Sequence, residues 1–83
     1  MEKELGPVAA FGETIKNLRH AKHLSQEQLA LNSGLDRTFI SLLERGLRQP
    51  TLTTLFQIAA TLEIPPSEII RKMEDLANVS EKG

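Results

Sequence analysis

Cysteine is absent from the sequence, so neither a disulfide framework nor a thiolate metal site is available. No apolar run approaches the length of a membrane span, and the first ten residues lack the basic start and long apolar stretch of a signal peptide. These absences predict a cytoplasmic protein that does not associate with a membrane. The chain has 83 residues, of which 40% are hydrophobic, so we expect one modest core and no second domain.

The residue groupings of an enzyme are also missing. His20 and His23 lie three residues apart and could share a metal ion on a helix, but no third ligand stands at a useful spacing. The five glycines are scattered, so there is no glycine-rich phosphate loop, and no nucleophile has a recognisable setting. We therefore expect no catalysis, no cofactor, no metal and no small-molecule ligand, and we interpret the two histidines as solvated surface.

Positive charge is not in excess, since the net charge is −1 and the pI is near 6.1. This balance argues against indiscriminate nucleic-acid binding. The distribution is uneven, because residues 13–50 hold six basic groups against four acids and residues 51–83 hold three against five. Any non-specific affinity for nucleic acid is therefore expected to be modest and steeply dependent on salt, the alternative being that these charges are only a solvated surface.

Residues 25–46 contain the signals of two short helices joined by a tight turn. Ser25 is a good N-cap, because its hydroxyl can accept a hydrogen bond from a free backbone N–H in the first turn. Gly34 ends that helix, since glycine adopts a positive φ without a Cβ clash. Asp36 offers a second N-cap, and the second helix is expected to run to about residue 45, with Gly46 just beyond its end. This layout is typical of a helix-turn-helix.

The second of these helices has one polar face. Ile40 and Leu43, at i and i+3, share the inward stripe. The opposite side carries Arg37, Thr38, Ser41 and Arg45. Such a face presents hydrogen-bond donors rather than salt-bridge pairs, and it suits DNA base edges and phosphates.

Together these residues resemble the Cro/repressor-type helix-turn-helix, also called the XRE family. The family pattern S/T-Q-E-x-L-A, then G, then I-S-x-[ILV]-E-x-G is present as Ser25-Gln26-Glu27, Leu29-Ala30, Gly34, Ile40-Ser41, Leu43-Glu44 and Gly46. The resemblance implies an all-α, lambda-repressor-like DNA-binding domain of five helices over roughly Phe11 to Leu76. The run from Leu35 to Ser41 is also similar to the recognition helix of restriction-modification controller proteins.

Arg37, Thr38 and Ser41 are the expected base-reading residues. Arginine can bind guanine O6 and N7 bidentately, the methyl group of threonine can pack on a thymine methyl, and Ser41 can reach a base or a phosphate. The alternative is that this face is merely exposed to solvent. Phe39 either contacts a sugar or a thymine methyl or packs back on the first helix, and Leu42 is equally undecided.

Other residues near that face are expected to contact phosphates. The family uses a glutamine in the place of Gln26 to donate to a phosphate, while its other end orients a side chain on the recognition helix. Arg45, Arg48 and Gln49 surround the loop that is expected to face the DNA backbone, and their alternative role is idle surface charge.

The family also implies an ion pair between Arg19, on the first helix, and Glu44, the last acid before Gly46. The pair would lock the first helix onto the recognition helix and leave part of Arg19 able to approach a phosphate.

The other helices follow from apolar spacing. We expect the first over Phe11 to His23, the fourth after an N-cap at Thr51, and the fifth from Pro66. Their expected apolar residues are Phe11, Ile15 and Leu18; Leu52, Leu55, Phe56, Ala59 and Leu62; and Ile69, Ile70, Met73 and Leu76. Residues 1–10 and 78–83 are expected to be a flexible arm and tail around a domain at 11–77.

The fifth helix has a surplus of apolar residues for its length. Some of Ile64, Ile69, Ile70 and Met73 are expected to be exposed in a monomer, which predicts a symmetric homodimer. The alternative is that all four fill the monomer core. A dimer would read two half-sites together, about one helical turn or roughly 34 Å apart, in a palindromic operator.

These features predict a dimeric transcriptional regulator of duplex DNA. Because no ligand domain is left over, its control is expected to come from its own concentration, as in a restriction-modification controller or a phage switch protein. The alternatives are the antitoxin of a toxin-antitoxin pair and a helix-turn-helix used as a protein-interaction adaptor.

Overall fold

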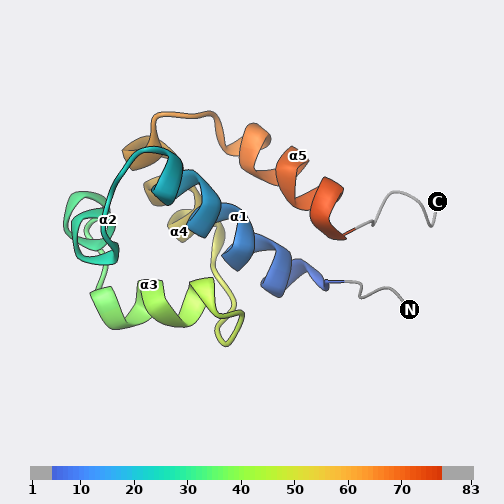
Figure 1. Ribbon diagram of the computed structural model, residues 1–83, viewed down its shortest axis with the longest axis horizontal. Coiled ribbons are helices and arrows are strands. Elements are labelled where there is room, and N and C mark those ends of the chain that lie inside the picture. The colour runs from blue at the N-terminus through green and yellow to red at the C-terminus, as the bar shows by residue number, and fades with distance from the viewer. Residues whose placement is uncertain (1–4, 78–83) are drawn as a thin grey trace.

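A computed structural model describes residues 5–77 and shows five α-helices (Figure 1). They are α1 (Pro7–Ala21), α2 (Gln26–Ser33), α3 (Arg37–Glu44), α4 (Leu52–Leu62) and α5 (Pro66–Ala77). Residues 5–77 contain no strand, so the prediction of an all-α fold with five helices is confirmed. None of the described helices is long and apolar enough to cross a membrane.

The longest helix, α1, packs against both α3 and α5. In Figure 1 it runs through the middle of the molecule, with α3 below it and α5 above it. α2 packs on α3 and α4, and α4 packs on α5. One side of α3 therefore faces the other helices, and its opposite side faces outward.

Apolar side chains from all five helices form one core. Its members are Phe11, Ile15, Leu29, Ala30, Ile40, Leu43, Leu55, Ile58, Ala59, Leu62 and Ile69. Removal of their apolar surface from water, at about 25 cal/mol per Å², is the main force that holds the short helices together.

α1 begins four residues earlier than apolar spacing indicated. Pro7 occupies its first position, where the missing N–H would have had no partner within the helix. Ala10 is completely buried, so the predicted arm boundary at residue 10 is wrong and residues 7–10 belong to the helix. The helix also ends at Ala21 rather than His23, whose φ is +58°. Residues 1–4 of the predicted arm and the predicted tail at 78–83 lie outside the described residues.

The apolar stripe predicted for α4 is partly wrong. Thr51 is its N-cap, as expected, and the Thr51 side chain accepts a hydrogen bond from the Thr54 N–H at 3.0 Å. However, Leu52 is 76% exposed and Phe56 is 59% exposed, whereas Ile58 is completely buried. The buried face is shifted around the helix, because α2 and α5 cover the side that contains Ile58 rather than the side that contains Leu52.

The residues predicted for a dimer interface divide between the core and the surface. Ile69 is completely buried, so its assignment to an interface is wrong. Ile64 and Met73 are half-buried and pack against the core, and Ile70 is 41% exposed. Neighbouring residues on a helix point about 100° apart, and α5 directs Ile69 into the core and leaves Ile70 toward solvent.

Candidate nucleic-acid interface

The turn between α2 and α3 is built as the sequence predicted. The Ser25 hydroxyl accepts from the Gln28 N–H at 3.0 Å, and the Gln28 side chain accepts from the Ser25 N–H at 2.8 Å, which completes a capping box at the start of α2. Gly34 ends α2 with φ +73°, and the Leu35 N–H donates to the Ala30 carbonyl at 2.9 Å. Asp36 is the N-cap of α3, but its side chain makes no capping hydrogen bond, which corrects that part of the prediction. The turn fixes where α3 starts.

The outward side of α3 has the predicted polar face. Ile40 and Leu43 are completely buried. Arg37 and Thr38 are exposed, and Ser41 is half-buried. Within residues 5–77 no acidic side chain forms an ion pair with Arg37. Its guanidinium is therefore available to an external acceptor.

The two apolar residues of α3 whose roles the sequence left open are Phe39 and Leu42. Phe39 is half-buried and packs against the hydrophobic core, which favours the packing role left open above over a contact with DNA. Leu42 is also half-buried.

A buried hydrogen-bond network ties the recognition helix to the helices behind it. Arg19 donates to both carboxylate oxygens of Glu44, from Nε to Oε2 at 2.7 Å and from Nη2 to Oε1 at 2.9 Å. The two side chains are 9% and 3% exposed. The hydrogen bonds that Arg19 donates to Glu44 raise the pKa of Arg19, which keeps the guanidinium charged. The predicted ion pair is therefore present.

Arg19 is less available to DNA than expected. Its remaining terminal nitrogen, Nη1, donates to the Leu24 carbonyl at 2.9 Å, so all three guanidinium nitrogens have protein partners. Together with its burial, this corrects the prediction that Arg19 also contacts a phosphate.

Gln26 joins the same network from the first position of α2. Its Nε2 donates to Glu44 Oε1 at 2.9 Å, which agrees with the prediction that one end of Gln26 holds a side chain of the recognition helix. The Gln26 side chain is half-buried, so part of it faces solvent at the edge of the α3 face.

The loop after α3 is polar and exposed. Arg45, Arg48 and Gln49 are all exposed, and no acid within residues 5–77 pairs with either arginine. Leu47, which the sequence reasoning did not single out, lies among them with 60% of its surface exposed. The Gly46 backbone, with φ +73°, turns the chain from α3 into this loop.

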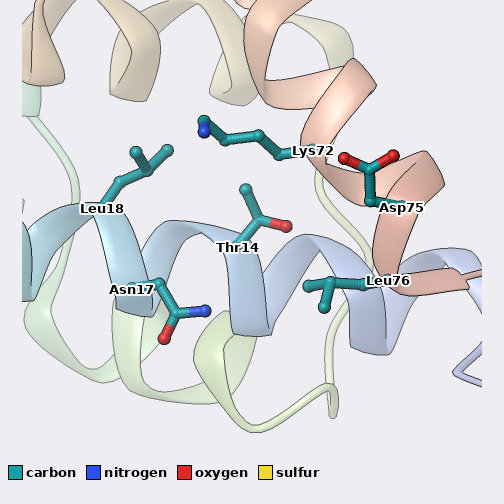
Figure 2. Close-up of a pocket in the computed structure, with 6 residues that line it drawn as sticks. All are labelled: Thr14, Asn17, Leu18, Lys72, Asp75 and Leu76. Carbon is teal, nitrogen blue, oxygen red and sulfur yellow. The ribbon is translucent and has the colours of Figure 1, made fainter.

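A groove of about 400 Å³ lies between α1 and α5, outside the candidate interface (Figure 2). Its lining residues are Thr14, Asn17, Leu18, Lys72, Asp75 and Leu76. Figure 2 shows the Thr14 side chain between the two helices. The Thr14 hydroxyl is buried and has no hydrogen-bond partner among the described residues.

We expect Thr14→Val to raise the free energy of unfolding by about 1–2 kcal/mol, because valine has nearly the same shape and removes a buried hydroxyl without a partner. Urea denaturation followed by circular dichroism measures this change. Thr54→Val is the control: Thr54 is also buried, but its hydroxyl lies 3.0 Å from the Thr51 hydroxyl, so this variant should lose stability. A loss of stability in Thr14→Val as well would mean that the Thr14 hydroxyl does have a partner in solution.

Comparison with known proteins agrees with this geometry. The family model described as Helix-turn-helix matches residues 15–69, which include the whole of α2, α3 and α4. The match covers more than half of the chain. The chain belongs to the helix-turn-helix family of transcriptional regulators.

Within that family the chain is similar to restriction-modification control proteins. Control protein C.MunI from Mycoplasma sp is 43% identical over 65 residues, which cover 77% of this chain and 88% of that protein. The crystal structure of the controller protein C.AhdI from Aeromonas hydrophila is 44% identical, with a TM-score of 0.73 over 75% of this chain and 94% of that one. The structure of C.Esp1396I bound to a 25 base pair operator site is 33% identical, with a TM-score of 0.77 over 87% and 95% of the two chains.

Proposed function

We propose that the protein is a homodimeric, controller-type transcriptional regulator that binds a palindromic operator in duplex DNA. The observation that carries this proposal is the outward face of α3. Its exposed donors have no acidic partner within residues 5–77, and the Glu44 network locks the helix to α1 and α2. A rigid helix with free donors is what major-groove reading requires. The similarity to C.Esp1396I, which is bound to an operator, supports the same reading.

We assign base reading to Arg37, Thr38 and Ser41. Arg37 is at the first position of α3, and recognition helices use their N-terminal residues to contact base edges. Its guanidinium suits guanine O6 and N7, the methyl group of Thr38 suits a thymine methyl, and the half-buried Ser41 hydroxyl suits a closely approaching base or phosphate.

We assign phosphate contacts to Gln26, Arg45, Arg48 and Gln49. Gln26 lies beside Glu44 at the C-terminal end of α3, and the other three residues follow that end along the chain, so all four are grouped near it. Contacts of this kind fix the position of a domain on DNA without reading its sequence.

A second copy of the chain is the partner we propose for the exposed apolar surface of α4 and α5. Leu52, Ile70 and Met73 line one groove of about 290 Å³, and Phe56 lies one turn beyond Leu52 on α4. The operator of C.Esp1396I has 25 base pairs, which extend about 85 Å at 3.4 Å each, whereas the longest extent of this chain is 37 Å. A similar operator would need more than one copy side by side. We call Leu52, Phe56, Ile70 and Met73 the dimer face.

The proposal includes no catalytic role, since the relatives are named as regulators and control proteins. A regulator of this kind acts where bacterial DNA is, in the cytoplasm. A methyltransferase gene and an endonuclease gene beside the coding sequence would support the controller role in particular.

Selection of bound sites from a random duplex library by the purified protein, at near-physiological salt, tests the proposal. Enrichment of a palindrome with two half-sites is the expected result. Failure of a folded protein to enrich any sequence would contradict it and would favour an antitoxin that needs its toxin, or a protein-interaction adaptor.

Arg37→Ala is expected to weaken binding to the selected operator by about 1–3 kcal/mol and to relax the base preference at one position of each half-site. Arg37 is exposed and pairs with no acid within residues 5–77, so the substitution removes the proposed base contact and leaves the fold intact. Fluorescence anisotropy on the operator and on a random duplex measures both affinities.

Arg48→Ala is the matched comparison, because it removes an equally exposed arginine from the loop after α3. It should weaken operator and random DNA alike and reduce the salt dependence. If the two variants behave the same on both DNAs, the division between base and phosphate contacts is wrong.

A further inference from the structure

Gly12, in the middle of α1, is in direct contact with the backbone at the end of the recognition helix. A Cβ carbon at this position would lie 2.8 Å from the Glu44 carbonyl oxygen and closer still to that of Leu43. Both atoms belong to the main chain, so no side-chain rotation can relieve the overlap. Only glycine lets α1 and α3 approach this closely.

Gly46, two residues after the end of α3, also lies close against α1. A Cβ carbon on Gly46 would lie 3.3 Å from the Cα atom of Ala9, which is one turn before Gly12. The end of α3 and the start of the following loop therefore rest on a flat part of α1 formed by Ala9 and Gly12.

Glu44 is consequently held from two directions. Arg19 lies seven residues after Gly12, two turns along the same side of α1, and it binds the Glu44 carboxylate at 2.7 and 2.9 Å. Gly12 receives the Glu44 backbone. The ion pair fixes the Glu44 side chain, and the absence of a side chain at residue 12 sets how far the α3 backbone stands from α1.

α3 has eight residues and is about 12 Å long, so its direction depends strongly on the position of each end. The turn at Gly34 fixes the first end, and the contact with Gly12 fixes the second. Base contacts tolerate displacements of only about 0.5 Å.

We infer that Gly12 is a positioning residue for sequence reading: its missing side chain sets the tilt of α3 and thereby the alignment of Arg37, Thr38 and Ser41 with base edges. The inference rests on the proposed function. Non-bonded carbon and oxygen atoms stay about 3 Å or more apart, so a methyl group at residue 12 must push the end of α3 away from α1 by an appreciable part of 1 Å.

Gly12→Ala tests the inference on the full-length protein. We expect its affinity for the selected operator to fall about tenfold or more, which corresponds to the loss of one well-formed base contact. Its affinity for a random duplex should change less than about threefold. Phosphate contacts come from flexible side chains, which adjust to a small displacement. Site selection with the variant should also show a weaker base preference within each half-site.

Two variants separate positioning from stability. Gly6→Ala adds the same methyl group at the N-cap of α1, where a Cβ carbon would have no atom within 4 Å. This variant should have the same operator and random-duplex affinities as the unmodified chain. Ile69→Val removes a methyl group from the core on α5, so it should lower the melting temperature but keep the ratio of operator to random affinity. All binding is measured where circular dichroism shows a folded protein, with equal trimethylamine N-oxide in every sample.

An unchanged ratio of operator to random affinity in folded Gly12→Ala overturns the inference. So does a variant that does not fold even in trimethylamine N-oxide, because Gly12 would then serve the fold alone. If the unmodified chain itself selects no operator, the proposed function fails first, and that result is seen before any variant is compared.

Discussion

Glu44→Ala is expected to lower the free energy of unfolding by about 3–5 kcal/mol, the usual effect of removing one partner from a buried ion pair. The Arg19 side chain, which is 9% exposed beside Glu44, would lose the carboxylate that balances its charge, and Gln26 would lose its acceptor. A small domain is stabilised by only about 5–15 kcal/mol in total, so the loss should be visible as partial unfolding near 37 °C. Urea denaturation followed by circular dichroism measures it.

The exposed pair of Glu68 and Arg71 provides the matched control. Its nitrogen–oxygen distance is 2.8 Å, close to the buried pair, but the Arg71 side chain is 62% exposed. Glu68→Ala should therefore cost less than about 1 kcal/mol, because solvent screens the interaction and replaces it. If Glu44→Ala and Glu68→Ala lower the free energy of unfolding equally, burial does not account for the effect of Glu44→Ala.

A double variant distinguishes a lost interaction from an uncompensated charge. Arg19→Met combined with Glu44→Leu removes both charges and keeps the apolar volume, so it should recover most of the stability lost in Glu44→Ala. We expect this double variant to fold and to bind operator DNA more weakly, because Gln26 no longer has a partner on α3.

The parts of the fold that the sequence predicted well are those with local causes. Ser25 begins α2 and Gly34 ends it through hydrogen bonds and a backbone conformation that involve only near neighbours in the chain. The polar face of α3 also follows from helical spacing, since Ile40 and Leu43 are buried and Arg37 is exposed. Such features need no knowledge of which helix packs on which.

The orientation of α4 could not be predicted in this way. The predicted face and the observed face share Leu55, Ala59 and Leu62. The predicted face also contains Leu52 and Phe56, whereas the observed face contains Ile58 instead. Both choices fit a helical period, and only the positions of α2 and α5 decide between them. The same limit applies to Ile69 and Ile70, which are adjacent in sequence but lie on different sides of α5.

The candidate site shows the same division. The pairing of Arg19 with Glu44 joins residues 25 positions apart, and it was expected only from the family resemblance. Gly12 was overlooked, although an isolated glycine inside a helical pattern is a recognised sign of close packing or function. The sequence therefore marks Gly12 as unusual, but it does not show that Gly12 packs against the backbone of Leu43 and Glu44.

The exposed dimer face is expected to control DNA affinity through dimerisation. Phe56→Glu is expected to give a folded monomer whose affinity for the full palindrome is about 100-fold lower or more, because the second half-site is no longer bound as part of the same complex. Phe56 is 59% exposed, so the added carboxylate faces solvent in the monomer and leaves the core intact. In the proposed dimer it would be buried without a partner. Sedimentation velocity measures the oligomeric state.

Leu31→Glu is the matched control for Phe56→Glu. Leu31 is 76% exposed on α2 and lies outside the dimer face, so this variant carries the same added charge and should still sediment as a dimer. A Phe56→Glu protein that remains dimeric at the unmodified dissociation constant would rule out the face on α4 and α5.

DNA containing a single half-site completes the test. Phe56 lies on α4, which packs on α2 and α5, whereas α3 packs on α1 and α2, so a substitution at Phe56 is expected to leave the reading face in place. Phe56→Glu should therefore bind an isolated half-site as well as the unmodified chain does, while it loses affinity for the whole operator. Loss on both DNAs would instead indicate damage to the reading helix, since only linkage between two copies distinguishes the full palindrome from its half.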